Sequence, residues 1–273
     1  MQVITIAREF GTLSNFEENA ICEKLNIKLV TKELLEARFK ELGFKEKLLE
    51  KLDEKHPRML DSFTKKDDLY LETLKTVIFN EISNNSCAII GRGSNFILNN
   101  IPNVIKVRFV APLEKRVANI AELLDISVKD AEILVKRSDR ERAGFCYYYF
   151  GEVWNEAANY DLVINTEFFN TSDILEILEK ALTSLAKDTD KNNEIIADAT
   201  LKQNIKFALF IKNDIEIKHR NIQCNNGTVT ITGNVSSNTV KQRVNDILEK
   251  IPQIKNIENN LTPILKDIAK RKE

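Results

Sequence analysis

The sequence predicts two domains: an α/β domain in which a parallel sheet is covered by helices, and then a small α+β domain. Three observations lead to this prediction. The front half alternates short apolar runs with long amphipathic stretches, which is typical of a parallel sheet with helices on its faces. A polar segment, Lys187–Glu194, follows. Beyond it, two alternating runs flank Asn225–Gly227, and Asn-Gly between such runs predicts a β-hairpin.

The first domain is expected to cover residues 1–186, and a chain of 273 residues with 43% hydrophobic residues can fill two cores. Its strands are short apolar runs, expected at Val3–Ala7, Ser86–Ile90, Val104–Val110 and Leu162–Ile164. Its helices carry Leu, Ile and Phe at helical spacing, and they are expected at Asn15–Leu25, Thr31–Asn84, Leu113–Arg142 and Asp173–Ala186.

The second domain is expected at residues 197–273, after a linker at residues 187–196 that has no apolar anchors. Its order is α-β-β-α-β, which is typical of a small two-layer domain. The predicted elements are a helix, two hairpin strands, a second helix and a final strand, at Ala199–Phe210, Glu216–Gln223, Thr228–Asn234, Thr239–Lys250 and Ile254–Leu261.

Charge is distributed unevenly along the chain. The whole sequence has 40 Lys and Arg against 41 Asp and Glu, so its net charge does not indicate a nucleic-acid-binding protein. From Thr200 to Glu273, however, basic residues number 13 and acidic residues 7. Such a basic tail is typical both of a surface that meets an anionic partner and of solvated, lysine-rich helix faces.

The four cysteines, Cys22, Cys87, Cys146 and Cys224, are scattered and form no Cys-x-x-Cys pair, so we expect no metal site built from them. Thiols in apolar contexts fit a reducing compartment. The sequence begins directly as a strand, and it contains no apolar run of membrane-spanning length. We therefore expect a cytoplasmic protein.

The loop Arg8–Ser14 (REFGTLS) joins the first predicted strand to the first helix. A loop in this place can bind phosphate when it exposes consecutive backbone N–H groups and aims a helix N-terminus at the anion. That geometry favours glycine and a nearby cation. Here Gly11 stands alone, and no Gly-Lys-Ser/Thr follows it. The pattern thus predicts a phosphate-binding loop that lacks most of its glycines.

Two other segments carry candidate anion-binding side chains. Arg92 lies between two glycines at the end of a predicted buried strand, where open α/β sheets bind ligands. We favour a guanidinium that binds phosphate there over an exposed arginine in a plain turn. Lys136–Arg142 (KRSDRER) suits either a mobile flap over a transferring phosphoryl group or a solvated helix with salt bridges. The aromatic residues that follow, Tyr147–Tyr149 and Trp154, could stack a base or pack the flap.

In combination, these segments resemble the cytidylate-kinase-like family of P-loop nucleoside-monophosphate kinases. The matching pieces occur in order from Met1 to about Ala186 and read ITIAREFG, LNIKLVTKELL, CAIIGRGSNFIL, VIKVRFVAPLEKRV, DRERAGFCYYYFGEVW and YDLVINT. Residues from about Ala197 to Leu261 resemble a BON domain, a module associated with phospholipid binding, through VTITGNVSSNTVKQRVNDILEKIPQIKNIENNL. The resemblance implies a P-loop kinase fold followed by a docking module.

The resemblance also implies roles for the first loop. The family's loop typically reads REFGSGG, and by this resemblance Gly11, Thr12 and Ser14 would cradle the ATP phosphates. This chain departs from the family at two of these positions, where Leu13 and Ser14 replace glycines. Because the family's loop lacks the usual lysine, Arg8 would be the compensating cation. A leucine at position 13 would block the close approach of the backbone to phosphate or resist the φ values that glycine permits.

On the acceptor side, Gly91 and Arg92 match the Gly-Arg that contacts the acceptor monophosphate, whereas Gly93 stands where those enzymes have an aspartate. Asp139 and Arg142 match the Asp-x-x-Arg of the arginine-bearing lid, and Arg140 lies between them. The implied reaction is ATP-dependent phosphorylation of a nucleoside monophosphate, with CMP the first expectation. Mg²⁺ would bridge the donor phosphates, and the lid arginines would stabilise the transferring group.

A second hypothesis belongs to another class of protein. A kinase fold that has lost catalysis could sense a nucleotide or act as a scaffold, while residues 197–273 bind a membrane surface or a partner protein. The altered Gly11 loop favours this hypothesis, and the arginines at positions 92, 140 and 142 favour the enzyme.

Overall fold

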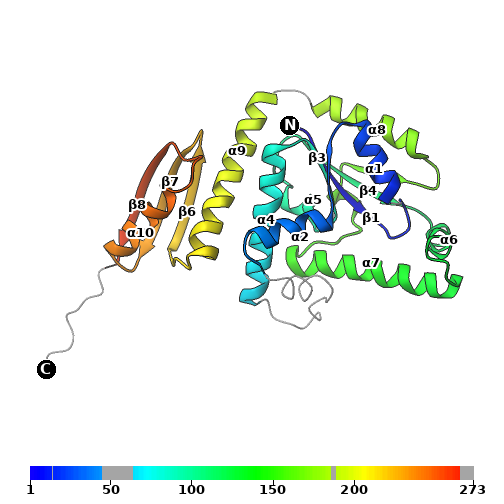
Figure 1. The fold of residues 1–273 in the computed structure, drawn as a ribbon, viewed down its shortest axis with the longest axis horizontal. Helices are drawn as coiled ribbons and strands as arrows, with labels where there is room; N and C mark the ends of the chain where they lie inside the picture. Colours follow the sequence, from blue (N-terminus) through cyan, green and yellow to red (C-terminus); the bar gives the residue numbers. More distant parts are fainter. Residues whose placement is uncertain (14, 45–63, 186–188, 265–273) are drawn as a thin grey trace. The chain divides into compact units, whose positions relative to one another are not determined.

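The computed structural model describes residues 1–13, 15–44, 64–185 and 189–264. The chain divides into two compact units, Met1–Asn192 and Asn193–Glu273 (Figure 1). The residues expected as a linker are helical from Thr189 onward, because helix α9 (Thr189–Lys206) begins there. Polar residues at that point therefore form the exposed start of a helix rather than a connecting coil. In the part of the chain that the structure describes, no helix is both long enough and apolar enough to cross a membrane.

The first unit contains a five-stranded sheet in the order β2-β3-β1-β4-β5, and every neighbouring pair is parallel. This confirms the predicted α/β class. The strands are β1 (Val3–Arg8), β2 (Lys28–Val30), β3 (Cys87–Ile90), β4 (Val104–Val110) and β5 (Leu162–Asn165). The sequence did not reveal β2, because a three-residue strand is too short to show a period.

Helices connect these strands. They are α1 (Asn15–Lys24), α2 (Lys32–Glu41), α4 (Lys65–Asn84), α5 (Ser94–Ile97), α6 (Leu113–Leu124), α7 (Val128–Phe150), the short 3₁₀ turn η1 (Ala157–Asn159) and α8 (Thr171–Leu185). Within the predicted helical region 31–84, residues 45–63 lie outside the described part. The predicted helix 113–142 is two helices, because Asp125 adopts a left-handed conformation with φ 51°.

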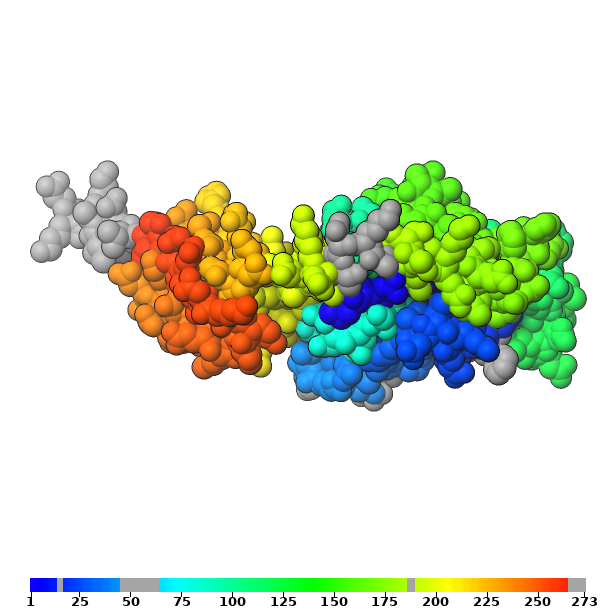
Figure 2. Space-filling model, turned by 90° about the horizontal axis from the view of Figure 1, so that it is seen from above, coloured from blue at the N-terminus to red at the C-terminus, as the bar shows by residue number. Residues whose placement is uncertain are grey.

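The main core of this unit lies between one face of the sheet and helices α1 and α8. It is built from alternate residues of β1 and β4, such as Ile4 and Phe109, which pack against Ile21 of α1 and Leu178 of α8. Figure 2 looks onto this side and shows α1 and α8 next to each other. The other alternate residues of the same strands, including Arg108, face away from this core. Thus the loops at the carboxyl ends of β1, β3 and β4 are attached to strands that are held in place by a packed core.

The second unit is a small α+β fold, as the sequence predicts. A three-stranded sheet has the order β6-β7-β8, with β6 antiparallel and β8 parallel to β7. The elements after α9 are a π-helical segment η2 (Phe207–Lys212), β6 (Lys218–Asn225), β7 (Thr228–Val235), α10 (Asn238–Leu248) and β8 (Asn256–Pro263). A core of Ile, Val and Leu side chains, Ile205, Ile231 and Val244 among them, fills the space between sheet and helices.

Candidate active site

The candidate site is formed where neighbouring parallel strands end. β1 pairs with both β3 and β4, so the loop after β1, the turn after β3 and the end of β4 lie at one edge of the sheet. The backbone N–H of Gly91, directly after β3, donates to the carbonyl of Ile6 in β1 at 2.8 Å. Helix α7 reaches this edge as well, because Asp139 of that helix contacts the loop after β1. This is the place where α/β sheets bind their ligands.

The loop after β1 is a tight turn that needs its single glycine. Gly11 has φ 89°, and a Cβ atom there would lie 2.7 Å from the carbonyl oxygen of Arg116. Any other residue would meet both that backbone oxygen and the cost of a left-handed conformation. Thr12 closes the turn, since its backbone N–H and its hydroxyl both donate to the carbonyl of Glu9, at 3.3 and 2.8 Å. Asn119 Nδ2 donates to the Gly11 carbonyl at 2.8 Å.

Leu13 belongs to the hydrophobic core and not to the surface of the loop. Its side chain is 7% exposed and packs in the cluster that contains Ile6, Ile21 and Phe109. The leucine therefore does not project into the space where a phosphate would approach the turn. Its side chain instead ties the loop to the base of the sheet, which a glycine would not do. Ser14, the last predicted member of the loop, lies outside the described residues.

Glu9 holds two buried arginines beside the loop. Its Oε1 lies 3.1 Å from Arg108 Nη2, and its Oε2 lies 3.3 Å from Arg116 Nε. The Arg108 guanidinium also lies over the Trp154 ring, 4.6 Å from its centroid, and donates to the Trp154 carbonyl at 2.8 Å. The backbone N–H of Ala111 donates to Glu9 Oε2 at 3.3 Å. A buried charge is tolerated when it is paired and hydrogen-bonded, and Glu9 provides this for both guanidinium groups.

Asp139 ties helix α7 to the loop. Its Oδ1 accepts the backbone N–H of Phe10 at 3.1 Å, and its Oδ2 lies 2.6 Å from Arg116 Nη1. In a phosphate-binding loop, backbone N–H groups point at the ligand. Here one such N–H is bound to a carboxylate of the protein. The Asp-x-x-Arg aspartate thus acts in this structure as a link between α7, α6 and the loop.

Arg8 and Arg142 bring two further cations to the loop. Arg142 Nη1 donates to the carbonyl of Arg8 at 2.5 Å, and its guanidinium lies 5.6 Å from the centroid of the Phe10 ring. Arg8 Nη1 donates to the carbonyl of Leu13 at 3.0 Å. Burial, with Arg8 close by, lowers the pKa of Arg142 to about 10. The Arg142 guanidinium therefore remains charged at neutral pH, and the two arginines bring positive charge to this end of β1.

Of the predicted donor and lid residues, five gather around the loop: Arg8, Gly11, Thr12, Asp139 and Arg142. Arg140 does not join them. It is exposed on α7, and its Nε donates to the carbonyl of Lys136 at 3.2 Å. A helix places residues two apart on different faces, which separates Arg140 from Arg142.

The turn after β3 has an unusual backbone. Three consecutive residues, Gly91, Arg92 and Gly93, have φ values of 67°, 56° and 63°. Arg92 lines a small cavity of about 20 Å³ together with Glu36 of α2 and Tyr70 of α4. Burial lowers the pKa of Arg92, and Glu36 acts in the opposite direction. A left-handed arginine between two glycines is a strained arrangement that marks a functional turn in many proteins.

Phe150, at the end of α7, occupies the space beside Gly93. A Cβ atom at Gly93 would lie 2.1 Å from Cε2 of the Phe150 ring. The same ring is 5.4 Å from the Phe96 ring and 6.2 Å from the Phe145 ring. The family pattern has an aspartate at this position, and here a ring takes the place that its side chain would need. The glycine and the ring thus fit each other, since a side chain at position 93 would overlap the Phe150 ring.

The aromatic residues at the end of α7 are structural in this conformation. Tyr149 is buried, and its hydroxyl lies 3.4 Å from Asp67 Oδ1, while the Tyr148 hydroxyl donates to Asp67 Oδ2 at 3.0 Å. Burial opposes ionisation of Asp67, but hydrogen bonds from Thr64 and the two tyrosines outweigh it and lower the pKa of this carboxyl. Trp154 is buried as well. Of the two interpretations of these aromatic residues, packing is the one that these contacts support.

Sequence reasoning missed four residues of the loop surroundings: Glu9, Glu18, Arg108 and Arg116. A signal for one of them was present, because Arg108 interrupts the apolar strand Val104–Val110 and a buried arginine needs an anionic partner. The pairing of Arg116 with the loop depends on how α6 packs, and no local pattern could indicate it.

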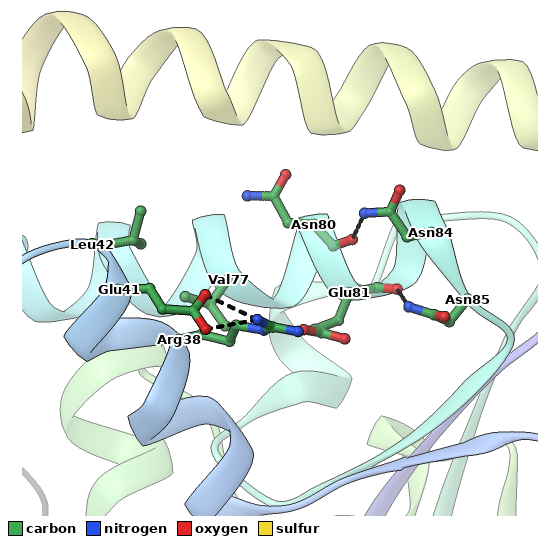
Figure 3. Close-up of a pocket in the computed structure, with 8 residues that line it drawn as sticks. All are labelled: Arg38, Glu41, Leu42, Val77, Asn80, Glu81, Asn84 and Asn85. Atoms are coloured by element: carbon green, nitrogen blue, oxygen red, sulfur yellow. Dashed lines mark hydrogen bonds and ion pairs between the residues drawn. The ribbon is translucent and has the colours of Figure 1, made fainter.

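A wider hollow than the one beside Arg92 lies elsewhere in the first unit. It has a volume of about 370 Å³ and lies along α2 and α4, where Arg38 bridges Glu41 and Glu81 (Figure 3). Asn85 in its wall stands just before the amino end of β3. The hollow therefore lies toward the opposite end of the sheet from the Gly91 turn and contains none of the predicted site residues. In the described residues, no group of three or more His, Cys, Asp or Glu side chains could hold a metal ion.

Comparison with known proteins gives a match for each of the two units. Residues 3–168 match the model of the cytidylate kinase-like family. The chain belongs to the cytidylate kinase-like family. Residues 197–262 match the model of the BON domain. Both assignments confirm the resemblances seen in the sequence. The family of the first unit is kinase-like and nucleotide-binding.

Individual relatives are more distant. A cytidylate kinase of Methanosarcina barkeri is 36% identical over 87 residues, which is 31% of this chain and 48% of the relative. The chain thus spans about half the length of that relative. An uncharacterized protein from Eubacterium ventriosum has a similar structure, with a TM-score of 0.53, 21% identity, and coverage of 67% of this chain and 99% of that one. A shikimate kinase from Bacteroides thetaiotaomicron aligns with a TM-score of 0.42 and 12% identity, covering 67% of this chain and 98% of that one.

Proposed function

We propose that the first unit transfers a phosphoryl group from ATP to a nucleoside monophosphate, with CMP as the first acceptor to test. The observation that carries this proposal is the placement of arginines at the ends of adjacent strands. Arg8 and Arg142 lie at the loop after β1, and Arg92 lies in the turn after β3. Guanidinium groups in two neighbouring loops suit two phosphate groups that must approach each other.

The charges around the loop fit a polyphosphate. Four guanidinium groups meet three carboxylates there, namely Arg8, Arg108, Arg116 and Arg142 against Glu9, Glu18 and Asp139. The surplus is positive, which favours an anionic ligand. Because the described residues hold no group of carboxylates for a metal, Mg²⁺ would bind chiefly through the phosphates that it bridges.

Each residue would have a defined part in this reaction. Arg92, with Gly91, would hold the acceptor phosphate, while Gly11, Thr12 and Ser14 would face the donor phosphates with Arg8 as the cation of the loop. Arg142 would stabilise the charge spread over the transferring group, and Asp139 would fix its helix against the loop. Arg140 would join only if α7 rotates or closes. Such catalysis consists of positioning and electrostatic stabilisation.

We expect Arg92→Ala to weaken CMP binding by about 1.5–3 kcal/mol, because a charge-assisted hydrogen bond to phosphate is lost. The measurement is calorimetric titration of the full chain with CMP, followed by a turnover assay with Mg·ATP and the common monophosphates. Arg243→Ala, an exposed arginine of the second unit, is the control and should bind CMP as the unchanged chain does. Equal CMP affinity in Arg92→Ala would remove this residue from the site.

A second function is favoured by two other observations: the Phe10 N–H is bound to Asp139, and Phe150 fills the space beside Gly93. Both would suit a kinase fold that senses a nucleotide or serves as a scaffold without transferring phosphate. The same titrations separate the two functions. Binding of both Mg·ATP and CMP with turnover identifies an enzyme, whereas CMP binding without turnover identifies a sensor, and no binding of either identifies a scaffold.

For the second unit we propose docking on an anionic phospholipid surface. The outward face of its sheet carries neutral side chains such as Gln223 and Thr230 together with the carboxylate of Glu258, which accepts a hydrogen bond from the Thr230 hydroxyl at 2.7 Å, so this face does not suit an anionic lipid surface. Exposed cations lie instead around the start of β6, at Lys212, Lys218 and Arg220. We expect the full chain to sediment with phosphatidylglycerol vesicles and not with phosphatidylcholine vesicles, and to release at high salt.

Failure to sediment with either kind of vesicle would favour the alternative that residues 197–273 bind a partner protein.

We also propose that the protein is located in the cytoplasm. The support for this location is its free cysteines, three of which are buried: Cys22, Cys87 and Cys146.

A further inference from the structure

We propose that Glu18 competes with bound phosphate for Arg8 and Arg142, so that this one carboxylate sets the affinity of the β1 loop for anions. The inference rests on the proposed donor site and adds to it a determinant outside the loop itself. It also implies that protonation of Glu18 favours anion binding.

The geometry places Glu18 against the cation that the loop depends on. Glu18 lies in the first turns of α1, its side chain is 2% exposed, and its Oε1 lies 2.9 Å from Arg8 Nε. Among the described residues this oxygen accepts no hydrogen bond, so its contact with Arg8 is an ion pair without hydrogen-bond alignment. Arg8 also binds the Leu13 carbonyl, so one guanidinium spans the loop and the carboxylate. A phosphate at the loop would need the same guanidinium.

The charges that face Glu18 come from three elements. Arg8 at the end of β1 and Arg142 of α7 are the cations, and Glu17 on α1 itself is the neighbouring anion. Cys22, one turn further along α1, is the other titratable group in contact, and its thiol stays protonated because burial raises its pKa to about 12. Burial raises the pKa of Glu18 to about 7, although Arg8 and Arg142 oppose that rise.

The consequence is a site whose charge changes near neutral pH. When Glu18 is ionised, it neutralises part of the field of Arg8 and Arg142 on the loop. When it is protonated, both cations are available to an incoming anion. Binding and protonation are linked, so an anion that binds the protonated form better must also raise the pKa of Glu18. Because both partners of the ion pair are partly or fully buried, salt should screen this effect only weakly.

The test is calorimetric titration of the full chain with inorganic tripolyphosphate at pH 6 and pH 8, for the unchanged chain and for Glu18→Gln. This probe has no base or ribose, so it reports on the donor loop alone. We expect Glu18→Gln to bind about tenfold more tightly than the unchanged chain at pH 8, and about equally at pH 6, because only the protonated fraction is competent. Glu23→Gln, an exposed carboxylate on the same helix, is the matched control and should behave as the unchanged chain does.

A second measurement uses only the unchanged chain. With ¹³C-labelled glutamate, the Glu18 carboxyl signal should titrate near pH 7, and tripolyphosphate should move its midpoint upward. The inference would be overturned if the unchanged chain and Glu18→Gln bound tripolyphosphate with equal affinity at pH 8. It would also be overturned if the ligand did not move the midpoint of the Glu18 titration, or if neither protein bound tripolyphosphate. If the tenfold gain appears but no phosphoryl transfer to CMP occurs, the inference stands and the proposed enzyme fails. If transfer occurs without the gain in affinity, the proposed enzyme stands and the inference fails.

Discussion

Glu9→Ala is expected to lower the free energy of unfolding of the first unit by about 3 kcal/mol, and it should be the most damaging single change at the loop. Glu9 is the shared partner of Arg108 and Arg116, whose side chains are 5% and 8% exposed. Removing it leaves two buried guanidinium groups with less compensation, and an uncompensated buried charge is far more costly than a lost surface ion pair.

The measurement is urea unfolding followed by fluorescence of Trp154, the single tryptophan of the chain. This indole packs against Arg108, so its signal reports on the unit that contains the mutation. Glu9→Gln keeps the shape and one acceptor oxygen, and it should cost less than Glu9→Ala. Glu114→Ala, an exposed carboxylate in the first turn of α6, should change stability by no more than about 0.5 kcal/mol. A loss for Glu9→Ala as small as that of Glu114→Ala would show that the arginines do not depend on Glu9.

The secondary structure could be predicted well wherever local pattern decides it. The strand Val104–Val110 has the bounds that the sequence predicts, and the predicted hairpin forms around Gly227, although its first strand begins and ends two residues later than expected, because alternation and Asn-Gly act over a few residues. The short strand β2 and the break at Asp125 could not be predicted in this way. β2 exists because β3 offers it an edge to pair with, and the left-handed Asp125 is fixed by the packing of α6 on α7.

The candidate site could be predicted only in part, for a related reason. The family pattern indicates which residues stand in the loop and the lid, such as Gly11 and Asp139, but it does not indicate what they contact. The sequence presents Leu13 as an obstacle to phosphate, whereas the structure uses it as a core residue. Asp139 resembles a lid residue, and its contacts with Phe10 and Arg116 form only when α6, α7 and the loop have come together. Tertiary packing decides such contacts.

The second large effect is expected at the turn after β3. Gly93→Asp should cost more than about 3 kcal/mol, because the new Cβ would lie 2.1 Å from the Phe150 ring and the residue has φ 63°. In a Phe150→Ala background the ring is absent, and the same Gly93→Asp change should cost only about 1 kcal/mol, which is the strain of a left-handed aspartate. Urea unfolding of the four proteins, followed by Trp154 fluorescence, gives this coupling directly.

The same four proteins bear on function, because the double variant restores the aspartate that the family has beside Gly91 and Arg92. If the acceptor pocket is otherwise intact, Gly93→Asp with Phe150→Ala should bind CMP more tightly than Phe150→Ala alone. Gly93→Ser with Phe150→Ala is the matched control, since it adds a side chain at the same strained position without a carboxylate. Strictly additive stability costs would mean that the Phe150 ring moves aside freely. The residues at positions 93 and 150 would then affect stability independently, and the ring would not close the acceptor site.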